Sequence, residues 1–384
     1  MAGLDPAIHA MGHPAMTALS LAQRLIRCRS VTPADDGAQD LLAQELAALG
    51  FEVTRLTFGD TPNLFARIGT GSPHLCFADH TDVVPPGRGW QHDPFGGVIT
   101  GGRLYGRGAC DMKGAIAAFI AATARHVAVG PPRGSISLLI TGDEEGPATN
   151  GTIRVLDWMQ AHNHLPNACI VGEPTNPASM GEVIKIGRRG SLNATITMPG
   201  IMGHVAYPHR AQNPIPPLLA ALTELSTHTL DTGTDRFEPS NLQITSIDVG
   251  NPATNVIPAQ ATSRLNIRFN TQHNGADLCR WIAETVARHS PAAIVATSIS
   301  GEAFLTDGPL GARMAAIIER TIGRRPRLDT GGGTSDARFI ARYAPVAEFG
   351  LVGATMHQAD ESVPVADLAA LTDIYAAILQ DFLP

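Results

Sequence analysis

The sequence has few cysteines, and their spacing fits neither a disulfide framework nor a cysteine-rich metal site. Only five occur in 384 residues, and no two of them form a C-x-x-C pair. An odd, scattered set is typical of reduced thiols in a reducing compartment. We therefore expect free thiols throughout. The five are Cys28, Cys76, Cys110, Cys169 and Cys279.

Charged residues are also scarce, and no apolar run is long enough to cross a membrane. Charged residues make up 16% of the chain, and the net charge of −7 excludes a general attraction to nucleic acid or to an anionic membrane. The most apolar stretch, residues 114–130, contains Arg125 and His126 and is shorter than the roughly 20 residues that a span requires. Residues 1–16 lack the basic and apolar segments of a secretory signal. We expect a soluble cytoplasmic protein in which residues 1–15 form a disordered extension.

The chain does contain enough apolar material for two domains. Hydrophobic residues make up 44% of it, and 384 residues exceed what one small core usually holds. In the first half, apolar runs of strand length alternate with segments of helical spacing, which predicts an α/β domain whose sheet is covered on both faces. The predicted strands are 51–57, 63–68, 74–78, 135–141 and 168–171, and the predicted helices are 17–28, 38–49, 113–129 and 151–162.

The pattern changes near residue 190, where strands with one wet face replace the continuous apolar runs. We expect a small inserted α+β domain over residues 191–303, with two helices on one face of a sheet of three or four strands. The α/β domain then comprises residues 16–190 and 304–384. The insert's predicted strands are 191–199, 241–249 and 262–270 and its helices 215–227 and 275–289, and after it we expect a helix over 311–321 and a strand over 346–349.

Three of the predicted strands lead directly into acids or histidine. HLCFA leads into DHTD at 79–82, SISLLIT into GDEEG at 142–146, and ACIV into GEP at 172–174. In an open α/β sheet the site forms outside the carboxyl ends of the strands, so these clusters are expected to converge. GACDMKG at 108–114, just before a helix, and TMH at 355–357, in a late loop, add two more clusters.

The combined residue types point to metal ions. Two histidines and several carboxylates cannot share a partly buried pocket unpaired, because like charges at short range are costly. Imidazole and carboxylate ligands without thiolate suit zinc, with cobalt or manganese as substitutes. Five ligands are too many for one ion, but they suffice for two if one carboxylate bridges. The clustered candidates are His80, Asp82, Asp111, Glu144, Glu145, Glu173 and His357.

Each signal has a simpler interpretation when it stands alone. An Asp-Glu-Glu run is usually a solvated loop or a helix N-terminus, and His80 with Asp82 would make an ordinary salt bridge at a strand end. Their conjunction at several strand ends is what favours a site. The glycine-rich segments fit no nucleotide motif, because Asp111 stands at the third glycine of a dinucleotide fingerprint and no Gly-Lys-Ser/Thr follows residues 331–333.

Nine segments together resemble the M20 family of di-zinc aminoacylases and peptidases. They follow the family's order and cover nearly the whole chain after about Leu19. The resemblance implies a zinc-peptidase-like catalytic domain, with a mixed sheet covered by helices, that carries an inserted α+β dimerisation domain over residues 191–303. The segments are FADHTDVVPPG, GRGACDMKG, TGDEEGPATNGT, IVGEPT, GRRGSL, GHVAYPH, NVIPAQ, GGGTSDARFI and ATMHQADE.

For the metal centre, the resemblance implies two Zn²⁺ ions per subunit, with Co²⁺ as a substitute. Asp82 would orient a ligand histidine through its other ring nitrogen, and Glu144 would be the general acid and base. Asp79 departs from the pattern, since the family most often has Gly before the metal-binding histidine. The implied ligands are His80 and Glu173 for one ion and Glu145 and His357 for the other, with Asp111 bridging the two.

The resemblance also implies a small, carboxylate-rich substrate. The segments at 150–152, 187–191 and 333–336 point to the branch that removes succinyl groups, and away from deacylases of acetylornithine or of general N-acyl amino acids. Arginine suits such a substrate because its planar fork matches a carboxylate. Thr254 stands where this branch usually has a second Asn beside Asn255. The substrate-binding candidates are Arg189, Tyr207, Asn255, Arg268, Gly333 and Thr334.

The resemblance further implies a homodimer formed through the inserted domain. That domain would lend His204 to the neighbouring subunit's site as an oxyanion donor. From the sequence alone, the simpler alternatives are that His204 is an ordinary loop histidine and that Arg268 is a surface charge on a strand. A non-catalytic relative that uses the fold for binding is a further alternative, but it would have little reason to keep Glu144 and every metal position.

Overall fold

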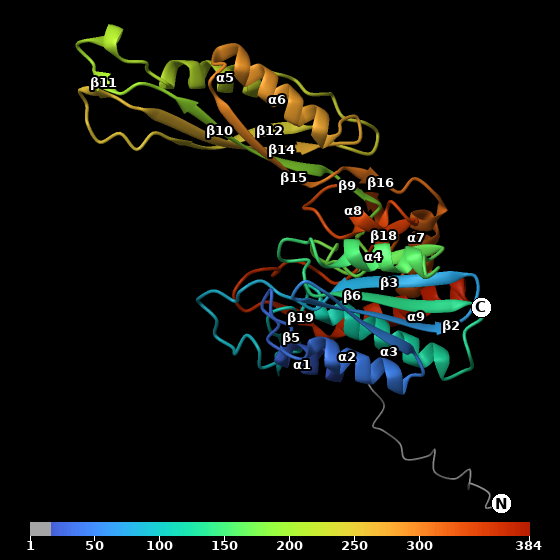
Figure 1. The fold of residues 1–384 in the computed structure, drawn as a ribbon. Coiled ribbons are helices and arrows are strands. Elements are labelled where there is room, and N and C mark those ends of the chain that lie inside the picture. The colour runs from blue at the N-terminus through green and yellow to red at the C-terminus, as the bar shows by residue number, and fades with distance from the viewer. Residues whose placement is uncertain (1–16) are drawn as a thin grey trace, which may run out of the picture. The chain divides into compact units, whose positions relative to one another are not determined.

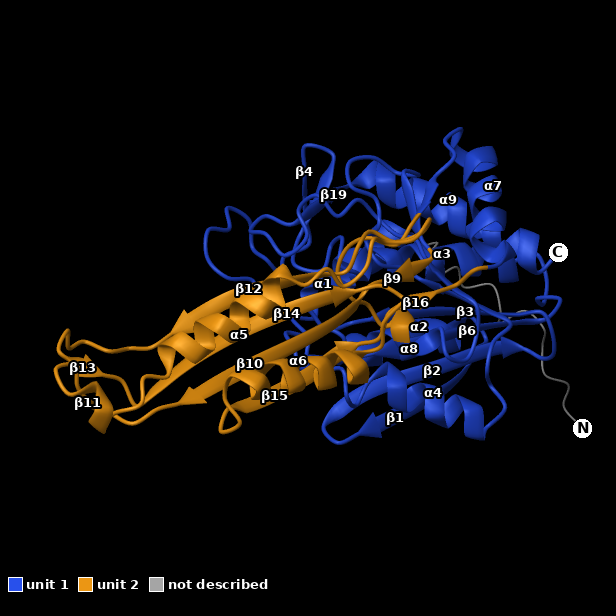
Figure 2. Cartoon of the chain, turned by 90° about the horizontal axis from the view of Figure 1, so that it is seen from above, with its two compact units in different colours: residues 1–185, 308–328, 339–384 blue, residues 186–307, 329–338 orange. Residues whose placement is uncertain are grey.

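The computed structural model describes residues 17–384, so the predicted extension over residues 1–15 lies outside the described residues. The chain divides into two compact units (Figure 2): unit 1 comprises residues 1–185, 308–328 and 339–384, and unit 2 comprises residues 186–307 and 329–338. Residues 329–338, which the sequence assigned to the segment after the insert, cluster with unit 2. In the described chain no helix combines the length and the apolar character that a membrane crossing demands.

Unit 1 is built on a mixed sheet, which confirms the predicted α/β class. The strand order is β1-β2-β6-β3-β7-β18-β8-β17, with β3 parallel to both of its neighbours and β7 parallel to β18. Strands β3, β6 and β7 are buried along their whole length, which explains their continuous apolar sequences. The strands are β1 (Glu52–Phe58), β2 (Thr61–Gly69), β3 (His74–His80), β6 (Ser135–Thr141), β7 (Ala168–Val171), β8 (Val183–Lys185), β17 (Arg327–Asp329) and β18 (Val346–Glu348).

Helices cover both faces of this sheet. Phe65 of β2 contacts Trp158 of α4, with ring centroids 5.4 Å apart, whereas Phe77 of β3 stacks on Phe119 of α3 at 4.0 Å. The strand register places Phe65 and Phe77 on opposite faces, so α4 lies on one face and α3 on the other, with α9 beside α3 (Figure 1). The helices are α1 (Ala18–Arg27), α2 (Ala38–Ala48), α3 (Lys113–Val127), α4 (Thr152–Ala161), α7 (Pro309–Ile322), α8 (Ala337–Ile340) and α9 (Val365–Phe382).

A small sheet in unit 1 connects two distant parts of the chain. Strand β5 (Arg103–Tyr105) pairs with β4 (Val98–Thr100) on one side and with β19 (Ser362–Pro364) on the other. The backbone N–H of Gly106 also donates to the carbonyl of Glu361 at 2.9 Å. Residues 106–111 and 357–361 are thereby held against one another.

Unit 2 is a four-stranded antiparallel sheet with two helices packed against it. The strand order is β12-β14-β10-β15, and apolar side chains of β10, β14, α5 and α6 form one buried core. The elements are β10 (Gly190–Pro199), β12 (Asn241–Asp248), β14 (Gln260–Phe269), β15 (Ile294–Gly301), α5 (Ile215–Thr227) and α6 (Gly275–His289), with the short pairs β9 (Gly187–Arg188) and β16 (Phe304–Leu305), and β11 (Gly203–His204) and β13 (Val256–Ile257).

Several predicted elements have the same bounds in the structure, and helix α9 and strand β15 are the longest of those that were not predicted. Strands β6 and β7 and helices α5 and α6 match the predicted ranges. Helix α9 was missed because its sequence, ADLAALTDIYAAIL, is apolar on most sides and gives little helical periodicity. Strand β15 was missed because it is an exposed edge strand with small polar residues, IVATSISG.

The aromatic contact between β3 and α3 generates a stability prediction. Phe119 is 0% exposed, and Tyr375 of α9 meets the rings of Phe77 and Phe119 edge-on. Because Phe119→Ala opens a cavity between two elements, we expect it to lower the free energy of unfolding by about 3–5 kcal/mol. Denaturant unfolding measures this loss. Val129→Ala is the control, since Val129 is 88% exposed, and equal stability of the two variants would contradict the packing described.

Candidate metal centre

Three parallel strands deliver polar side chains to one edge of the unit 1 sheet. Strand β3 ends at His80, β6 is followed by Glu144 and Glu145, and β7 is followed by Glu173. Since β3 is parallel to both β6 and β7, the three carboxyl ends lie side by side. The side chains that the sequence scatters over nearly a hundred positions therefore meet at the ends of fully buried strands.

Asp111 reaches the same place from the loop before α3. Both backbone N–H groups of Cys110 and Asp111 donate to Oε1 of Glu361, at 3.0 and 3.3 Å. The other carboxylate oxygen of Glu361 accepts from Arg107 at 2.5 Å. Both side chains of this ion pair are buried. The pair fixes the peptide of Asp111, while the carboxylate of Asp111 points toward the histidines.

The carboxylate of Asp111 lies between two imidazoles. Oδ1 is 3.4 Å from Nε2 of His80, and Oδ2 is 3.2 Å from Nε2 of His357. Nε2 of His357 also lies 3.0 Å from Oε1 of Glu145. One oxygen faces each histidine, which is the arrangement that a carboxylate bridging two cations requires.

The remaining acids complete two overlapping sets of ligand atoms. In the described residues, one set is His80, Asp111 and Glu145 and the other is His80, Glu144 and Glu173, each with its ligand atoms within 4.8 Å of one another. Together with His357, these sets contain all five predicted ligands. They also contain Glu144, the predicted acid and base, whose Oε2 lies 4.0 Å from Nε2 of His80.

The cluster fits metal ions because its buried polar atoms lack other partners. Within residues 17–384, neither Nε2 of His80 nor Oδ1 of Asp111 makes a hydrogen bond, although both are buried. Burial raises the pKa of Glu173 well above its usual range, and the charges of Asp111 and Glu144 raise it further. Hydrogen bonds with Asp111 and Glu145 raise the pKa of His357 to about 10. This excess of acidic groups is what divalent cations would neutralise.

Asp82 uses its main chain and its carboxylate for different contacts in the site. Nδ1 of His80 lies 2.8 Å from the backbone carbonyl of Asp82 and 3.7 Å from its carboxylate, so the main chain orients the imidazole. The carboxylate instead accepts the backbone N–H groups of Glu144 at 3.2 Å and Glu145 at 3.0 Å. Burial raises its pKa to about 6. Asp82 thus links the end of β3 to the loop after β6.

The sequence analysis missed the Arg107–Glu361 pair. Arg107 also donates to the carbonyls of Pro86 at 3.3 Å and of His357 at 3.4 Å, so it holds both the Asp111 loop and the loop that carries His357. A usable signal was present, because each residue lies within a few positions of a predicted ligand. Nothing in the sequence pairs two charges 254 positions apart, however.

The substrate-binding candidates lie in unit 2 in separate groups. Burial and then the nearby charge of Arg189 lower the pKa of Arg268, so two guanidinium groups lie close together. Arg189 also lies 3.5 Å from Glu238. The carbonyl of Gly333, next to Thr334, accepts from Arg188 at 3.2 Å.

His204, Tyr207 and Asn255 form another group in unit 2. The backbone N–H of Val205 donates to the carbonyl of Asn255 at 3.1 Å, and Nδ1 of His204 accepts the backbone N–H of Ala206 at 3.1 Å. The rings of His204 and Tyr207 are 5.8 Å apart, and both side chains are exposed.

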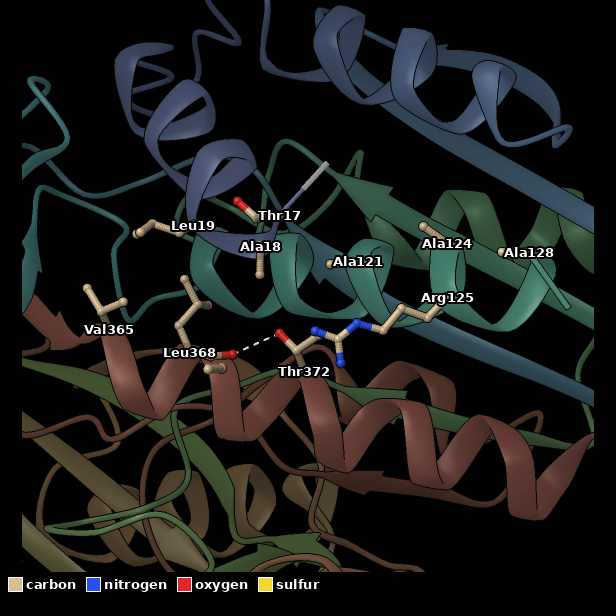
Figure 3. Close-up of a pocket in the computed structure, with 11 residues that line it drawn as sticks. Thr17, Ala18, Leu19, Ala121, Ala124, Arg125, Ala128, Val365, Leu368 and Thr372 are labelled. Atoms are coloured by element: carbon tan, nitrogen blue, oxygen red, sulfur yellow. Dashed lines mark hydrogen bonds between the residues drawn. The ribbon is translucent and has the colours of Figure 1, made fainter. Parts of the chain in front are cut away.

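A groove of about 480 Å³ in unit 1 lies away from these residues. It runs between α3 and α9 beside the start of α1, and Figure 3 shows the Arg125 side chain extended along it toward Thr372. Its α3 lining starts at Ala121, eight positions after the first residue of the helix, Lys113, or roughly 12 Å along it. The groove is therefore not part of the acid and histidine cluster.

Comparison with known proteins gives concordant results. The model of "Peptidase family M20/M25/M40" matches residues 76–381. The succinyl-diaminopimelate desuccinylase of Gluconacetobacter diazotrophicus is 63% identical, over 96% of this chain and 97% of its own, and that of Granulibacter bethesdensis is 61% identical, over 95% and 98%.

Solved structures share the fold at low sequence identity. An M20 family metallo-carboxypeptidase from Sulfolobus solfataricus superposes with a TM-score of 0.77 at 15% identity, over 94% of this chain and 98% of its own. A dinuclear metal-binding peptidase of the M20 family from Bacillus subtilis has a TM-score of 0.69 at 15% identity, over 95% and 99%. The chain belongs to the peptidase family M20/M25/M40.

Proposed function

We propose that this protein hydrolyses N-succinyl-LL-2,6-diaminopimelate to LL-2,6-diaminopimelate and succinate, a step of lysine and diaminopimelate biosynthesis. The observation that carries the proposal is the buried carboxylate of Asp111 between the Nε2 atoms of His80 and His357. This arrangement suits a two-cation amide hydrolase. Relatives more than 60% identical over nearly the full length carry the desuccinylase name. The five free cysteines support a cytoplasmic location.

The proposed cofactors are two Zn²⁺ ions per subunit, for which Co²⁺ would substitute. His80 and Glu173 would hold one ion, Glu145 and His357 the other, and Asp111 both. When bound, such a pair polarises the amide carbonyl and makes a water more acidic. The all-nitrogen-and-oxygen ligand set supports zinc, because zinc accepts imidazole and carboxylate together.

Glu144 is the proposed general acid and base. The carboxylate of Asp82 accepts the backbone N–H groups of Glu144 and Glu145 and so fixes the main chain of both residues. Glu145 is the proposed metal ligand, and Glu144 the proposed acid and base. Glu144 takes the proton of the attacking water and then passes it to the departing amine, while the amide carbon goes through a tetrahedral oxyanion. Its carboxylate lies 4.0 Å from Nε2 of His80, which puts it at the edge of the ligand cluster.

Substrate carboxylates would bind the arginines of unit 2. Arg189 and Arg268 are two partly buried cations close enough for the charge of Arg189 to lower the pKa of Arg268. An anion between them removes that repulsion, and each guanidinium offers a fork that matches a carboxylate. Tyr207, Asn255, Gly333 and Thr334 are the further proposed contacts.

The alternative is another M20 deacylase, such as one that acts on acetylornithine. The metal cluster does not discriminate between these substrates, because both reactions hydrolyse an amide. We expect a much higher kcat/KM for succinyl-diaminopimelate than for acetylornithine, since only the former offers a succinyl carboxylate to the arginines. Rates measured on both compounds decide the matter, and a preference for acetylornithine would overturn the proposed substrate.

We also propose a homodimer formed through unit 2, with His204 acting in the neighbouring subunit's site. The loop around His204 exposes the apolar side chains of Ile201, Met202 and Val205, and Tyr207 is exposed as well. A patch of this kind on a rigid antiparallel unit is typical of an interface. His204 would donate a hydrogen bond to the oxyanion there.

Glu144→Gln separates proton transfer from metal binding. Because the amide cannot accept the proton of the attacking water, we expect turnover to fall by roughly 10²–10⁴-fold while the metal content is unchanged. Steady-state rates and elemental analysis of the same sample measure both quantities. A variant with near-normal turnover would show that Glu144 is not the base.

Mixing two inactive variants tests the shared site. If His204 acts across the dimer, heterodimers of Glu144→Gln and His204→Ala contain one site with both residues intact, and about a quarter of the sites in a random mixture recover. If His204 acts within its own subunit, no site recovers. The activity of the mixture after dissociation and reassembly, compared with each variant alone, distinguishes the two cases.

A further inference from the structure

Asp79 is a buried acid that the proposed reaction does not use. It is the last residue before His80 in β3, and its side chain is 4% exposed. Oδ1 accepts the backbone N–H of Gly172 at 2.8 Å, whereas Oδ2 has no hydrogen-bond partner among residues 17–384. A carboxyl group placed here carries a cost of burial, so a single hydrogen bond to the neighbouring strand needs an explanation.

The hydrogen bond lies just beyond the end of a strand pairing. The register of β3 with β7 ends with Ala78 opposite Val171. The side chain of Asp79 continues this connection by one residue, because it reaches the peptide N–H of Gly172. His80, the last residue of β3, and Glu173, in the segment after β7, are the next residues along the chain. The contact therefore fixes the spacing of the two segments that carry these side chains.

Close packing makes this contact rigid. A Cβ atom added to Gly172 would lie 2.8 Å from Oδ1 of Asp79, and equally close to Ala115 of α3 and to the ring of Phe77. Side chains alternate along a strand, so Asp79 points to the α3 face and His80 to the opposite face. Asp79 thus lies on the face of the sheet opposite to His80 and is not part of the ligand cluster.

We propose that Asp79 is a positioning residue for the first cation, because it holds the Gly172 peptide and thereby sets the Glu173 carboxylate relative to His80. The inference rests on the proposed metal assignment and extends it to a residue outside the ligand set. Groups that orient ligands typically change metal affinity by 10–100-fold when they are removed. The second cation, held by Glu145 and His357, does not depend on Gly172.

The test compares Asp79→Ala with Asp79→Asn in the full-length protein. Zn²⁺ is titrated into the metal-free protein in competition with a chromophoric chelator, and Glu173→Ala and His357→Ala identify which binding step belongs to which ion. We expect Asp79→Ala to lower the Zn²⁺ affinity of one binding step by roughly 10–100-fold and to leave the other step unchanged. The affected step is the one that Glu173→Ala abolishes. Asp79→Asn keeps an oxygen for the Gly172 N–H and should bind both ions as the wild type does.

A matched control separates positioning from general destabilisation. Asp231 of unit 2 also accepts backbone N–H groups, from Gly233 and Ser240, so Asp231→Ala should lower the melting temperature and leave both binding steps intact. Asp79→Gly removes the same acceptor and serves if Asp79→Ala does not fold.

The possible results are distinct. Equal weakening of both steps, unchanged affinities in Asp79→Ala or Asp79→Gly, or an Asp79→Asn variant that behaves like Asp79→Ala would each overturn the positioning role. Wild-type protein that binds no pair of ions would remove the proposed function together with this inference. Normal binding of two ions by the wild type with no selective loss in the variants would remove the inference alone.

Discussion

Unit 1 depends on one electrostatic constraint, which is the gathering of several carboxylates and two imidazoles at the buried ends of three strands. The central strands are mostly apolar along their length, and the acidic side chains lie at or just beyond their carboxyl ends. Burial opposes ionisation of these acids and raises the pKa of Glu173 and of Asp82. In Asp111, the hydrogen bond with His357 and the charges of both histidines outweigh burial and lower the pKa. Such a cluster is stable only if positive charge is supplied to it, by protons or by cations.

The acidic residues in and around the cluster fall into two groups. One group accepts hydrogen bonds from main-chain N–H groups, and the other supplies the proposed metal ligands. Glu361 uses one oxygen for the peptides of Cys110 and Asp111 and the other for Arg107. Asp82 holds the peptides of Glu144 and Glu145, and Asp79 that of Gly172. Three buried carboxylates thus bind main-chain N–H groups and hold the segments that carry the proposed ligands.

The convergence of the cluster was predictable from the sequence, because three continuous apolar runs identify buried strands and each run leads directly into His or acid. The supports were not predictable to the same degree. Arg107 and Glu361 are linked only through the folded chain, and the main-chain carbonyl that orients His80 leaves no trace in a residue pattern. Helix α9 was missed because it is apolar on most sides and so shows little periodicity. Strand β15 was missed because it has few large apolar residues. Residues 329–338 follow the helix α7 segment of unit 1 in the chain but cluster with unit 2, which composition does not reveal.

Every residue of the acid and histidine cluster belongs to unit 1, whereas Arg189, Arg268 and His204 belong to unit 2. Each unit has its own sheet and its own buried core. If Arg189 and Arg268 bind the substrate as proposed, substitutions that change the acyl-group preference fall in unit 2 and leave the residues of the cluster unchanged. Under the proposed function, the substrate range of such a hydrolytic centre can be altered by engineering unit 2 alone.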